Sequence, residues 1–528
     1  MKHTHYRDYL VHTAPTFLHG ILTGAAVGIL IFFFRLAAEE LTALSREIYR
    51  AAQGNPLYIF LLFIGLAGFA LLMSFLHRFA PSAKGGGIPR SEGILRGSLD
   101  LRAVRALLGT VLGSFISFVC GLPLGSEGPA VLAGTATGHL TGYASRDRAA
   151  KDRYLMTGGA CAGFAVATGS PLSAILFALE EVHKRFTPML LLVTSASIVS
   201  ATAVNRMLCA AFGISPSLFD IPRLPTLSMK DIGYVALVAL FVSLAVFVFD
   251  LAVSNFNRLM RGKLRFVPHT VKLTCVFLLT GAIGLFALDA LGGGGGIITS
   301  LIGGEYTLPW IFALFFIRFV MMVLVSNSGA TGGIFVPTLA LGALIGGLAA
   351  KLFIPMGMDP SHTGIIILIA MSAFMGGAMR APLTAAVFFV EVTAQYENLF
   401  FAFLCVFLVY FITEIFNQVS FYDLLLEDME EDQNHGKKAE VARFYVKVSH
   451  GAFVIGKAVR DILWPRSTIV TGIIREGESS LSMDNGGEKK MYEGDTLLIK
   501  SEFFDEEDLR RRLVSLVGDE HPIEKLPD

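Results

Sequence analysis

The chain has 528 residues, of which 53% are hydrophobic and only 16% are charged. Its mean hydropathy of +0.61 is typical of a polytopic membrane protein and argues against a soluble one, whose core could not bury so much apolar surface. The 43 basic and 43 acidic residues cancel, so the charge gives no support for a nucleic-acid-binding protein or a polybasic lipid anchor. The five cysteines lie in apolar stretches and predict no disulfide framework.

A series of apolar segments predicts membrane helices along most of the chain. In chain order they lie near residues 18–38, 57–79, 102–122, 153–180, 190–213, 231–255, 268–291, 309–326, 331–354, 361–379, 382–394 and 398–420. Several segments are short or are interrupted by glycine and proline. Non-helical backbone at membrane depth is tolerated only where it lines a cavity that is buried in protein or filled with water. The breaks therefore indicate an all-α membrane protein with broken helices.

Two pairs of similar motifs indicate an internal repeat. "LGSEGPAVLAG" (124–134) resembles "GGIFVPTLALG" (332–342), and their prolines stand 208 residues apart. "SPLSAILFALEE" (170–181) resembles "APLTAAVFFVEV" (381–392), with an offset of 211 residues. Two matches at nearly one offset predict a duplication, and transporters with broken helices place their substrate site between such repeats. Hydropathy alone leaves open whether the two halves are inverted.

Three motifs share one local pattern of small residues, then proline, then an apolar helical run. They are "GGGIP" (85–89), "GSEGP" (125–129) and "GIFVP" (333–337). Proline suits the first helical turn because its missing N–H is not needed there, and the glycines let backbone amides turn toward a ligand. Buried helix N-termini leave N–H groups unpartnered, and their dipoles favour a negative partner. The pattern predicts an anion site built from neutral backbone donors.

In order and spacing, these motifs resemble the signature motifs of the CLC family of chloride channels and proton-coupled chloride exchangers. The resemblance covers roughly residues 15–425 and predicts a transmembrane anion transport domain over residues 1–425. It implies the inverted-repeat CLC fold with broken helices, in a homodimer whose subunits each have their own anion pathway. It also implies a multi-pass protein of the cell (plasma) membrane with both termini in the cytoplasm.

Glu127, in the second motif, is the first candidate for a gating and proton-coupling residue. A carboxylate at the N-terminus of a buried helix lies in the electrostatic well that would hold chloride, so ionised Glu127 is a tethered competitor of the anion. Protonation removes its charge and lets it leave the well. Glu127 matches the external gating glutamate of the family. The alternative is a capping carboxylate with a purely structural role.

Glu181 is the second candidate, in the stretch "FALEEVHKRF" (177–186). Adjacent residues of a helix point about 100° apart, so Glu180 and Glu181 cannot both face one pathway. Glu180 has a repeat counterpart in Glu391, whereas Glu181 aligns with Val392, and proton entry from one side is an asymmetric function. Glu181 matches the internal proton-transfer glutamate of exchanger members, which channel members usually replace. The alternative is a solvated acidic helix end.

The resemblance also implies an anion-binding set of backbone groups and one tyrosine. Its predicted members are Gly86, Gly87, Ile88, Gly125, Ser126, Gly128, Gly333, Ile334, Phe335 and Tyr422. Tyr422 matches the family tyrosine whose hydroxyl donates to the central chloride; alone, such a tyrosine is more often an interfacial anchor. Gly86 stands where many chloride-selective members carry serine, and Ser126 where a basic residue is common. These departures leave the selectivity among chloride, nitrate and bromide open.

After the membrane segments the character of the chain changes. Residues 426–440 are predicted to be an acidic polar linker, and residues 441–528 a small α/β domain with strands near 443–449, 468–476 and 495–501 and helices near 456–464 and 504–517. Asp461, the Trp464–Pro465 pair and "YEGDTLLI" resemble the TrkA-C domain of prokaryotic ion transporters. Such domains dimerise, and some bind cyclic dinucleotides at the dimer interface. The prediction is a cytoplasmic regulatory domain with such a ligand; the alternative is a dimer-stabilising module without one.

The favoured function is the exchange of chloride, or a similar monovalent anion, for protons by secondary active transport. The alternative is a passive voltage- or proton-gated chloride channel of the same fold, and Glu181 argues against it. An intramembrane enzyme lacks support, since the sequence contains neither a His-Glu-x-x-His metal pair nor a Gly-x-Ser-x-Gly turn. We expect chloride as the bound substrate and no metal or organic cofactor. The expected partners are chloride, protons, the lipid bilayer and a second copy of the chain.

Overall fold

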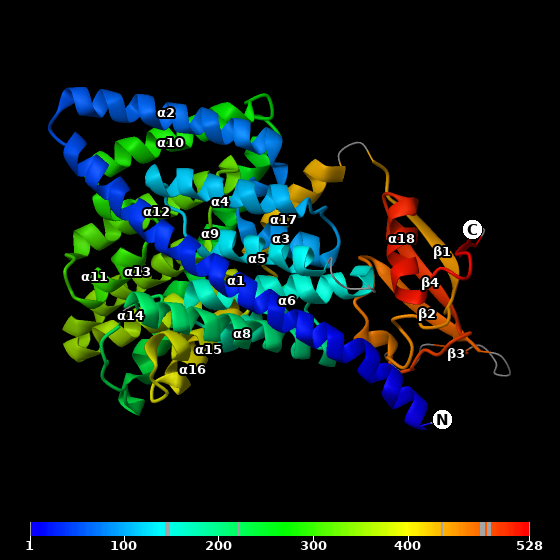
Figure 1. Ribbon diagram of the computed structural model, residues 1–528. Helices are drawn as coiled ribbons and strands as arrows, with labels where there is room; N and C mark the ends of the chain where they lie inside the picture. Colours follow the sequence, from blue (N-terminus) through cyan, green and yellow to red (C-terminus); the bar gives the residue numbers. More distant parts are fainter. Residues whose placement is uncertain are drawn as a thin grey trace.

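The structure, a computed structural model, describes residues 2–142, 148–219, 221–434, 437–475, 481–482 and 487–526. It describes the side chains in these ranges except those of residues 2–13, 148–150 and 481–482. A helical domain is followed by a smaller domain built on a β-sheet, which lies at one end of the molecule (Figure 1).

The helical domain consists of long, tilted helices interspersed with short ones. Its first helices are α1 (Lys2–Ala52), α2 (Pro56–Phe79), α3 (Gly87–Arg96), α4 (Ala103–Val119), α5 (Glu127–Gly142), α6 (Arg148–Thr168), α7 (Pro171–Phe177) and α8 (Pro188–Phe212). They are followed by α9 (Ile232–Arg261), α10 (His269–Phe286), α11 (Gly295–Ile302), α12 (Leu308–Ser328), α13 (Phe335–Phe353), α14 (Thr363–Ala378), α15 (Pro382–Thr393), α16 (Leu399–Ile415) and α17 (Phe421–Asn434).

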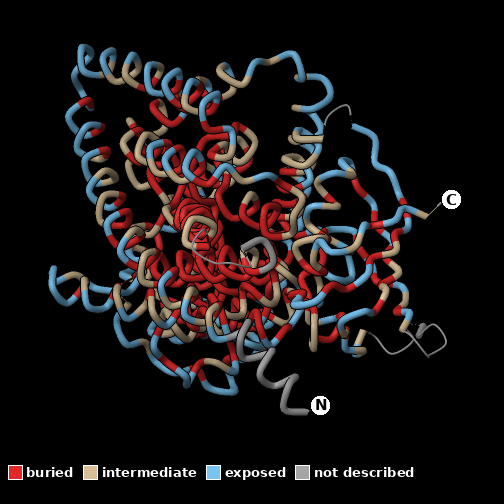
Figure 2. The backbone as a smooth tube through the Cα atoms, turned by 45° about the vertical axis from the view of Figure 1, so that its right-hand side comes forward, coloured by how far each residue is buried: buried red, intermediate tan, exposed pale blue. Residues whose placement is uncertain are grey.

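Eight helices of the described chain are long and apolar enough to cross a membrane, judged by length and composition. Large apolar side chains cover the outside, where Phe75 is 68% and Phe286 is 87% exposed. The buried residues gather in the middle of the domain, and the peripheral helices are exposed (Figure 2). This distribution suits a lipid solvent, and the predicted multi-pass membrane protein is confirmed.

Equivalent parts of the two repeats contact each other in opposite orientations. The backbones of Gly125 and Gly333 form an antiparallel bridge, in which each N–H donates to the other carbonyl at 2.7 Å. Glu180, just after α7, accepts N–H bonds at the N-terminus of α15, and Glu391, near the end of α15, accepts N–H bonds at the N-terminus of α7. Helices that cap each other in this way are antiparallel. The predicted inverted repeat is therefore confirmed.

The short helices are the main difference from the predicted segments. The segment predicted over 153–180 is two helices, because the chain turns at Gly169 (φ +70°) and α7 begins at Pro171. Hydropathy did not resolve α3, α5 and α11 as separate helices, since each is too short to span a bilayer. The stretch predicted as a linker over 426–440 is helical up to Asn434. Residues 426–434 form the C-terminal part of α17.

The C-terminal domain is a five-stranded sheet with one long helix against it. Its elements are β1 (Glu440–Lys447), β2 (Thr468–Ile474), β3 (Leu481–Ser482), β4 (Thr496–Phe503), α18 (Glu506–Val517) and β5 (Glu524–Lys525). The strands lie in the order β3-β2-β4-β1-β5, and all their pairings are antiparallel. The helix predicted over 456–464 is wrong: only a 3₁₀ turn forms, at Val459–Asp461. Backbone pairing with residues 487–491 replaces helical hydrogen bonds there.

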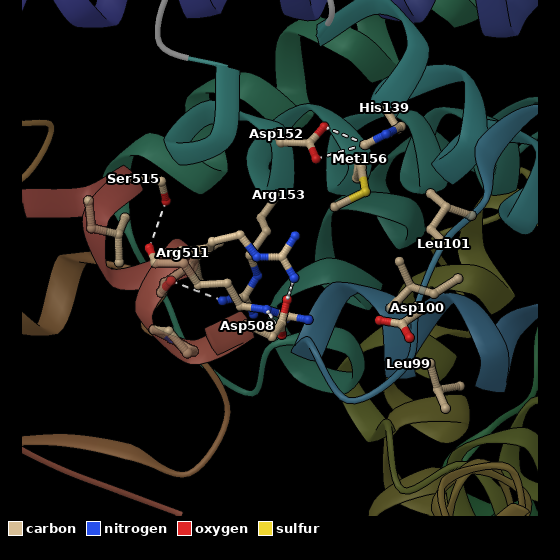
Figure 3. Close-up of a pocket in the computed structure, with 15 residues that line it drawn as sticks. Leu99, Asp100, Leu101, His139, Asp152, Arg153, Met156, Asp508, Arg511 and Ser515 are labelled. Carbon is tan, nitrogen blue, oxygen red and sulfur yellow. Dashed lines mark hydrogen bonds and ion pairs between the residues drawn. The ribbon is translucent and has the colours of Figure 1, made fainter. Parts of the chain in front are cut away.

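The C-terminal domain is docked on the membrane domain through arginines that bind backbone carbonyls. Arg153 of α6 donates to the carbonyls of Leu463 and Trp464, both at 2.9 Å, and also to that of Leu95 at the end of α3. Arg512 of α18 donates to the carbonyl of Gly97 at 3.0 Å. A cavity of about 450 Å³ lies between the domains, with the Arg511–Asp508 pair on the side of α18 and the His139–Asp152 pair on the membrane side (Figure 3).

Candidate functional site

Three glycine-rich loops meet in the middle of the membrane domain, and their backbones touch. They lead into α3, α5 and α13 and include the first helical residues, at residues 86–88, 125–128 and 333–335. A Cβ atom added to Gly87 would lie 2.0 Å from the carbonyl oxygen of Gly128, and one added to Gly128 would lie 2.8 Å from Cα of Gly333. No side chain fits at these contacts. The glycines are thus required by the close approach of three loops that are distant in sequence.

The same loops place helix N-termini at one point. Gly86 precedes α3 and Ile334 precedes α13, and neither helix receives a side-chain cap at its start. Helix α5 begins at Glu127 in the same place. Uncapped N-termini leave backbone N–H groups without intrahelical partners, and each carries a partial positive charge. Their convergence makes a positive site without a basic side chain.

The Glu127 side chain lies in this positive site. It is 3% exposed, and its Oε1 accepts a hydrogen bond from Ser126 Oγ at 3.3 Å. The backbone amides of Ser126, Glu127 itself and Val336 are close enough to interact with the carboxylate. Val336 belongs to the first turn of α13, so the carboxylate lies between the N-termini of α5 and α13. Its Oε2 has no hydrogen-bond partner among the described residues.

Tyr422 lies in the first turn of α17. Its side chain is fully buried, and its hydroxyl has no hydrogen-bond partner in the described part of the chain. The hydroxyl is within electrostatic range of Glu127, Glu181 and Glu92. A buried hydroxyl normally has a partner, so the Tyr422 hydroxyl is left to donate to an acceptor that the described residues do not supply.

The two adjacent glutamates of residues 177–186, Glu180 and Glu181, have different surroundings. Glu180 caps α15, accepting the amides of Leu383 and Thr384 at 3.0 and 2.8 Å. Glu181 is fully buried in a π-helical turn over Ala178–Val182 and accepts a hydrogen bond from Ser420 Oγ at 3.1 Å. Its Oε2 has no partner among the described residues. Glu180 therefore has a structural capping contact, whereas Glu181 is buried and uses only one of its two carboxylate oxygens in a hydrogen bond.

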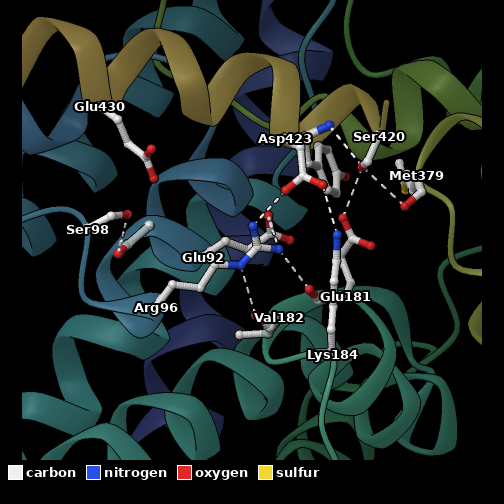
Figure 4. A network of polar contacts seen from close by, with 12 residues as sticks. Glu92, Arg96, Ser98, Glu181, Val182, Lys184, Met379, Ser420, Asp423 and Glu430 are labelled. Carbon is white, nitrogen blue, oxygen red and sulfur yellow. Dashed lines mark hydrogen bonds and ion pairs between the residues drawn. The ribbon is translucent and has the colours of Figure 1, made fainter. Parts of the chain in front are cut away.

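A polar network that the sequence did not predict surrounds Glu181 (Figure 4). Arg96, at the end of α3, donates to the backbone carbonyls of Glu181 and Val182 at 2.9 and 3.0 Å and to Asp423 at 2.6 Å. Lys184 donates to the other oxygen of Asp423 at 2.8 Å. These bonds hold the π-helical turn against α3 and the first turn of α17.

Glu92 is the other buried carboxylate of this network. It is 1% exposed, and its nearest cation is Arg96 at 3.7 Å, beyond hydrogen-bond distance. Neither of its carboxylate oxygens has a hydrogen-bond partner in the described chain. The available sequence signal was a carboxylate in the short helix that follows the first glycine motif. Such a residue is functional by default within a membrane domain.

The fold and site together define the class of protein. It is a polytopic membrane protein with inverted repeats, in which broken helices converge on a buried site, as in secondary transporters and channels built on the same plan. The profile of the family described as "Voltage gated chloride channel" matches residues 68–414. The chain belongs to this family, the CLC family, and is a transport protein and not an enzyme.

Individual relatives agree with this assignment. The chain is 30% identical over 394 residues to a protein named "H(+)/Cl(-) exchange transporter ClcA" from Vibrio cholerae serotype O1 (strain M66-2), covering 71% of this chain and 81% of that protein. A relative of the same name from Cronobacter sakazakii (strain ATCC BAA-894) is 32% identical over 393 residues, with the same coverage.

Solved structures share the fold. A slow cyanobacterial Cl⁻/H⁺ antiporter superposes with a TM-score of 0.71 at 25% identity, covering 80% of this chain and 99% of the other. A eukaryotic CLC transporter superposes with a TM-score of 0.66 at 22% identity, covering 80% and 74%. A CLC-type fluoride/proton antiporter gives 0.63 at 22% identity, covering 78% and 98%. The last two show the fold alone.

Proposed function

We propose that this protein exchanges chloride, or a similar monovalent anion, for protons across the membrane. The observation that carries the proposal is the position of Glu127, a titratable carboxylate at the start of α5, where this helix meets the N-termini of α3 and α13, which have no side-chain cap. The names of the relatives, which describe H⁺/Cl⁻ exchange, support the same function.

Chloride would bind to backbone amides and one hydroxyl. We assign the outer position to the amides around Glu127, contributed by Gly125, Ser126 and Gly128. The central position belongs to the amides of Ile334 and Phe335, the Tyr422 hydroxyl and the loop of Gly86, Gly87 and Ile88. Neutral donors hold an anion firmly enough for selection while allowing its release, whereas a buried lysine or arginine would retain it.

Proton coupling would follow from competition at the outer position. Ionised Glu127 occupies the place of an anion, and protonation lets chloride replace it, so one site alternates between the two ions. Glu181 would pass protons between Glu127 and the side that bears the C-terminal domain.

A passive anion channel of the same fold is the second candidate. It requires no internal proton acceptor, whereas Glu181 is a buried carboxylate with one unpartnered oxygen among the described residues. The position of Glu181 therefore favours exchange over passive conduction.

The experiment is proton movement driven by a chloride gradient in liposomes that contain the purified protein, with the membrane potential clamped at zero. We expect uphill proton transport, which stops when the chloride gradient is removed. Rapid chloride flux without any proton movement would refute exchange and establish the channel.

The remaining assignments are also proposals. We place the protein in the cell membrane as a homodimer with both termini in the cytoplasm; the N-terminal end of α1 and the C-terminal domain lie at the same end of the molecule (Figure 1). Chemical crosslinking in membranes tests the dimer.

We propose that residues 441–528 form a regulatory TrkA-C domain that binds a cyclic dinucleotide. A thermal shift of the full-length protein with cyclic dinucleotides tests the ligand, and no shift with any of them would leave a dimer-stabilising module.

A further inference from the structure

Positive charge is concentrated where α9 is connected to α10. Although the basic and acidic residues of the whole chain balance, no acidic residue occurs between Asp250 and Asp289. The basic residues of the same stretch are Arg258, Arg261, Lys263, Arg265 and Lys272. Residues 262–268 connect the two helices, each of which is long and apolar enough to cross a membrane. The five cations therefore lie at one surface of the membrane.

This surface is the one that bears the C-terminal domain. Arg261, the last residue of α9, forms ion pairs with Asp428 and Glu431 of α17. The chain that follows α17 enters the sheet of the C-terminal domain at Glu440. With that domain in the cytoplasm, as proposed above, the cations face the cytoplasmic leaflet, whose anionic lipids attract basic segments next to membrane helices.

Apolar side chains are interspersed with the cations. Phe266, in the connecting loop, is 80% exposed, and Val271, in the first turn of α10, is 46% exposed. Exposed apolar side chains among cations are typical of segments that insert at the boundary between lipid headgroups and acyl chains. Arg258 and Lys263 are also exposed, and neither forms an ion pair within the described part of the chain. Both cations are therefore available to a lipid phosphate.

An apolar groove of about 400 Å³ lies between α9 and α12. Residues that line it include Asn255, Phe256, Leu259, Phe319, Val320 and Val323. Leu259 is 39% and Val320 is 36% exposed, so the groove opens toward the surrounding lipid. Asn255 is the polar member of the lining. The groove can hold an acyl chain, which needs apolar contacts along its length and few polar ones.

The groove leads to the cations. It follows α9 as far as Leu259, two residues before the helix ends at Arg261. Arg258 follows Asn255 by three residues, so the two are neighbours on the surface of α9. An apolar groove that ends beside exposed cations matches both parts of a phospholipid with an anionic headgroup. A lipid without net charge would fill the groove but would gain little from the cations.

We propose that an anionic phospholipid binds here, with one acyl chain in the groove between α9 and α12 and its phosphate at Arg258 and Lys263. The occupant is a lipid and not a free phosphate ion, because only a lipid uses the groove and the cations together. The site does not depend on anion transport, and its test measures binding alone.

The experiment is a lipid titration of the full-length protein in detergent, followed by native mass spectrometry. The probes are phosphatidylglycerol and phosphatidylcholine with the same acyl chains. A cation beside an anionic headgroup raises affinity about fivefold, so two cations should give the wild-type protein an affinity for phosphatidylglycerol about twentyfivefold higher than for phosphatidylcholine. Arg258→Gln/Lys263→Gln should remove this preference. The control Arg50→Gln/Lys230→Gln removes the same charge from exposed positions at the end of α1 and before α9, and should keep it.

A second pair of variants tests the groove without changing any charge. Val320→Trp fills the groove and should weaken phosphatidylglycerol binding about tenfold, whereas Leu240→Trp, at a position of α9 that is 54% exposed, should leave it unchanged. Equal affinity of the wild-type protein for the two lipids, or equal losses in the two double variants, would overturn the proposal. Unchanged binding by Val320→Trp would also overturn it, since the charges alone would then hold the lipid. Displacement of the lipid by millimolar inorganic phosphate would show a site for free phosphate instead.

Discussion

Glu127→Gln is the sharpest test of the anion and proton site. The substitution keeps the size of the side chain and removes its charge and its titration. The carboxylate lies between the N-termini of α5 and α13, with the amide of Val336 within interaction range. A partly buried helix N-terminus stabilises a negative charge by up to about 2 kcal/mol, so the two termini together favour an anion there by about 2–4 kcal/mol.

In the wild-type protein the two helix N-termini stabilise the Glu127 carboxylate. In the variant the same N-termini can stabilise a bound chloride instead. Because 1.4 kcal/mol corresponds to a tenfold change in affinity, we expect chloride to bind at least about tenfold more tightly to Glu127→Gln. Chloride-driven proton transport should fall to the level of liposomes without protein. Calorimetric titration with chloride and proton uptake at zero membrane potential measure the two effects separately.

Glu180→Gln is the matched control. It also neutralises a glutamate, but one that caps α15 through the amides of Leu383 and Thr384. We expect it to lower thermal stability and to retain proton transport. Wild-type proton transport by Glu127→Gln would remove this residue from the mechanism, and an unchanged chloride affinity would show that its carboxylate does not occupy an anion position.

Other substitutions test the remaining parts of the site. Glu181→Gln should abolish proton transport while chloride flux persists, since the buried carboxylate can no longer carry a proton; equal loss of both fluxes in the liposome assay would contradict this role. Tyr422→Phe should weaken chloride binding about tenfold, because a hydrogen bond to a charged group contributes about 1.5–3 kcal/mol; calorimetry with unchanged affinity would exclude the hydroxyl as a ligand. Gly87→Ala should destabilise the protein by about 3 kcal/mol or more, because the new Cβ would lie 2.0 Å from the carbonyl oxygen of Gly128. The control for thermal unfolding is Gly65→Ala, where an added Cβ meets nothing within 4 Å; equal melting temperatures in the two variants would contradict the close packing of the loops.

Patterns of neighbouring residues in the sequence were sufficient to predict the general architecture of the protein. Apolar runs predicted the membrane helices, and the Gly and Pro motifs predicted buried helix N-termini, because both properties depend on residues that are adjacent in the chain. The same reasoning failed at 456–464, where backbone pairing with residues 487–491 replaces the predicted helix. Propensity is a weak signal where distant backbone offers better hydrogen bonds.

Which polar residues act together was decided only by the tertiary structure. The sequence placed Glu180 and Glu181 side by side, and the repeat alignment separated them, but packing showed that one caps α15 while the other is buried beside Ser420. For Glu92 the signal was only that of a carboxylate within a membrane domain, and the contact between Arg96 and Asp423 had no signal. Their roles depend on helices that meet across long separations in the chain, and the electrostatic energy of a charged group is set by whatever lies within a few ångströms of it in space.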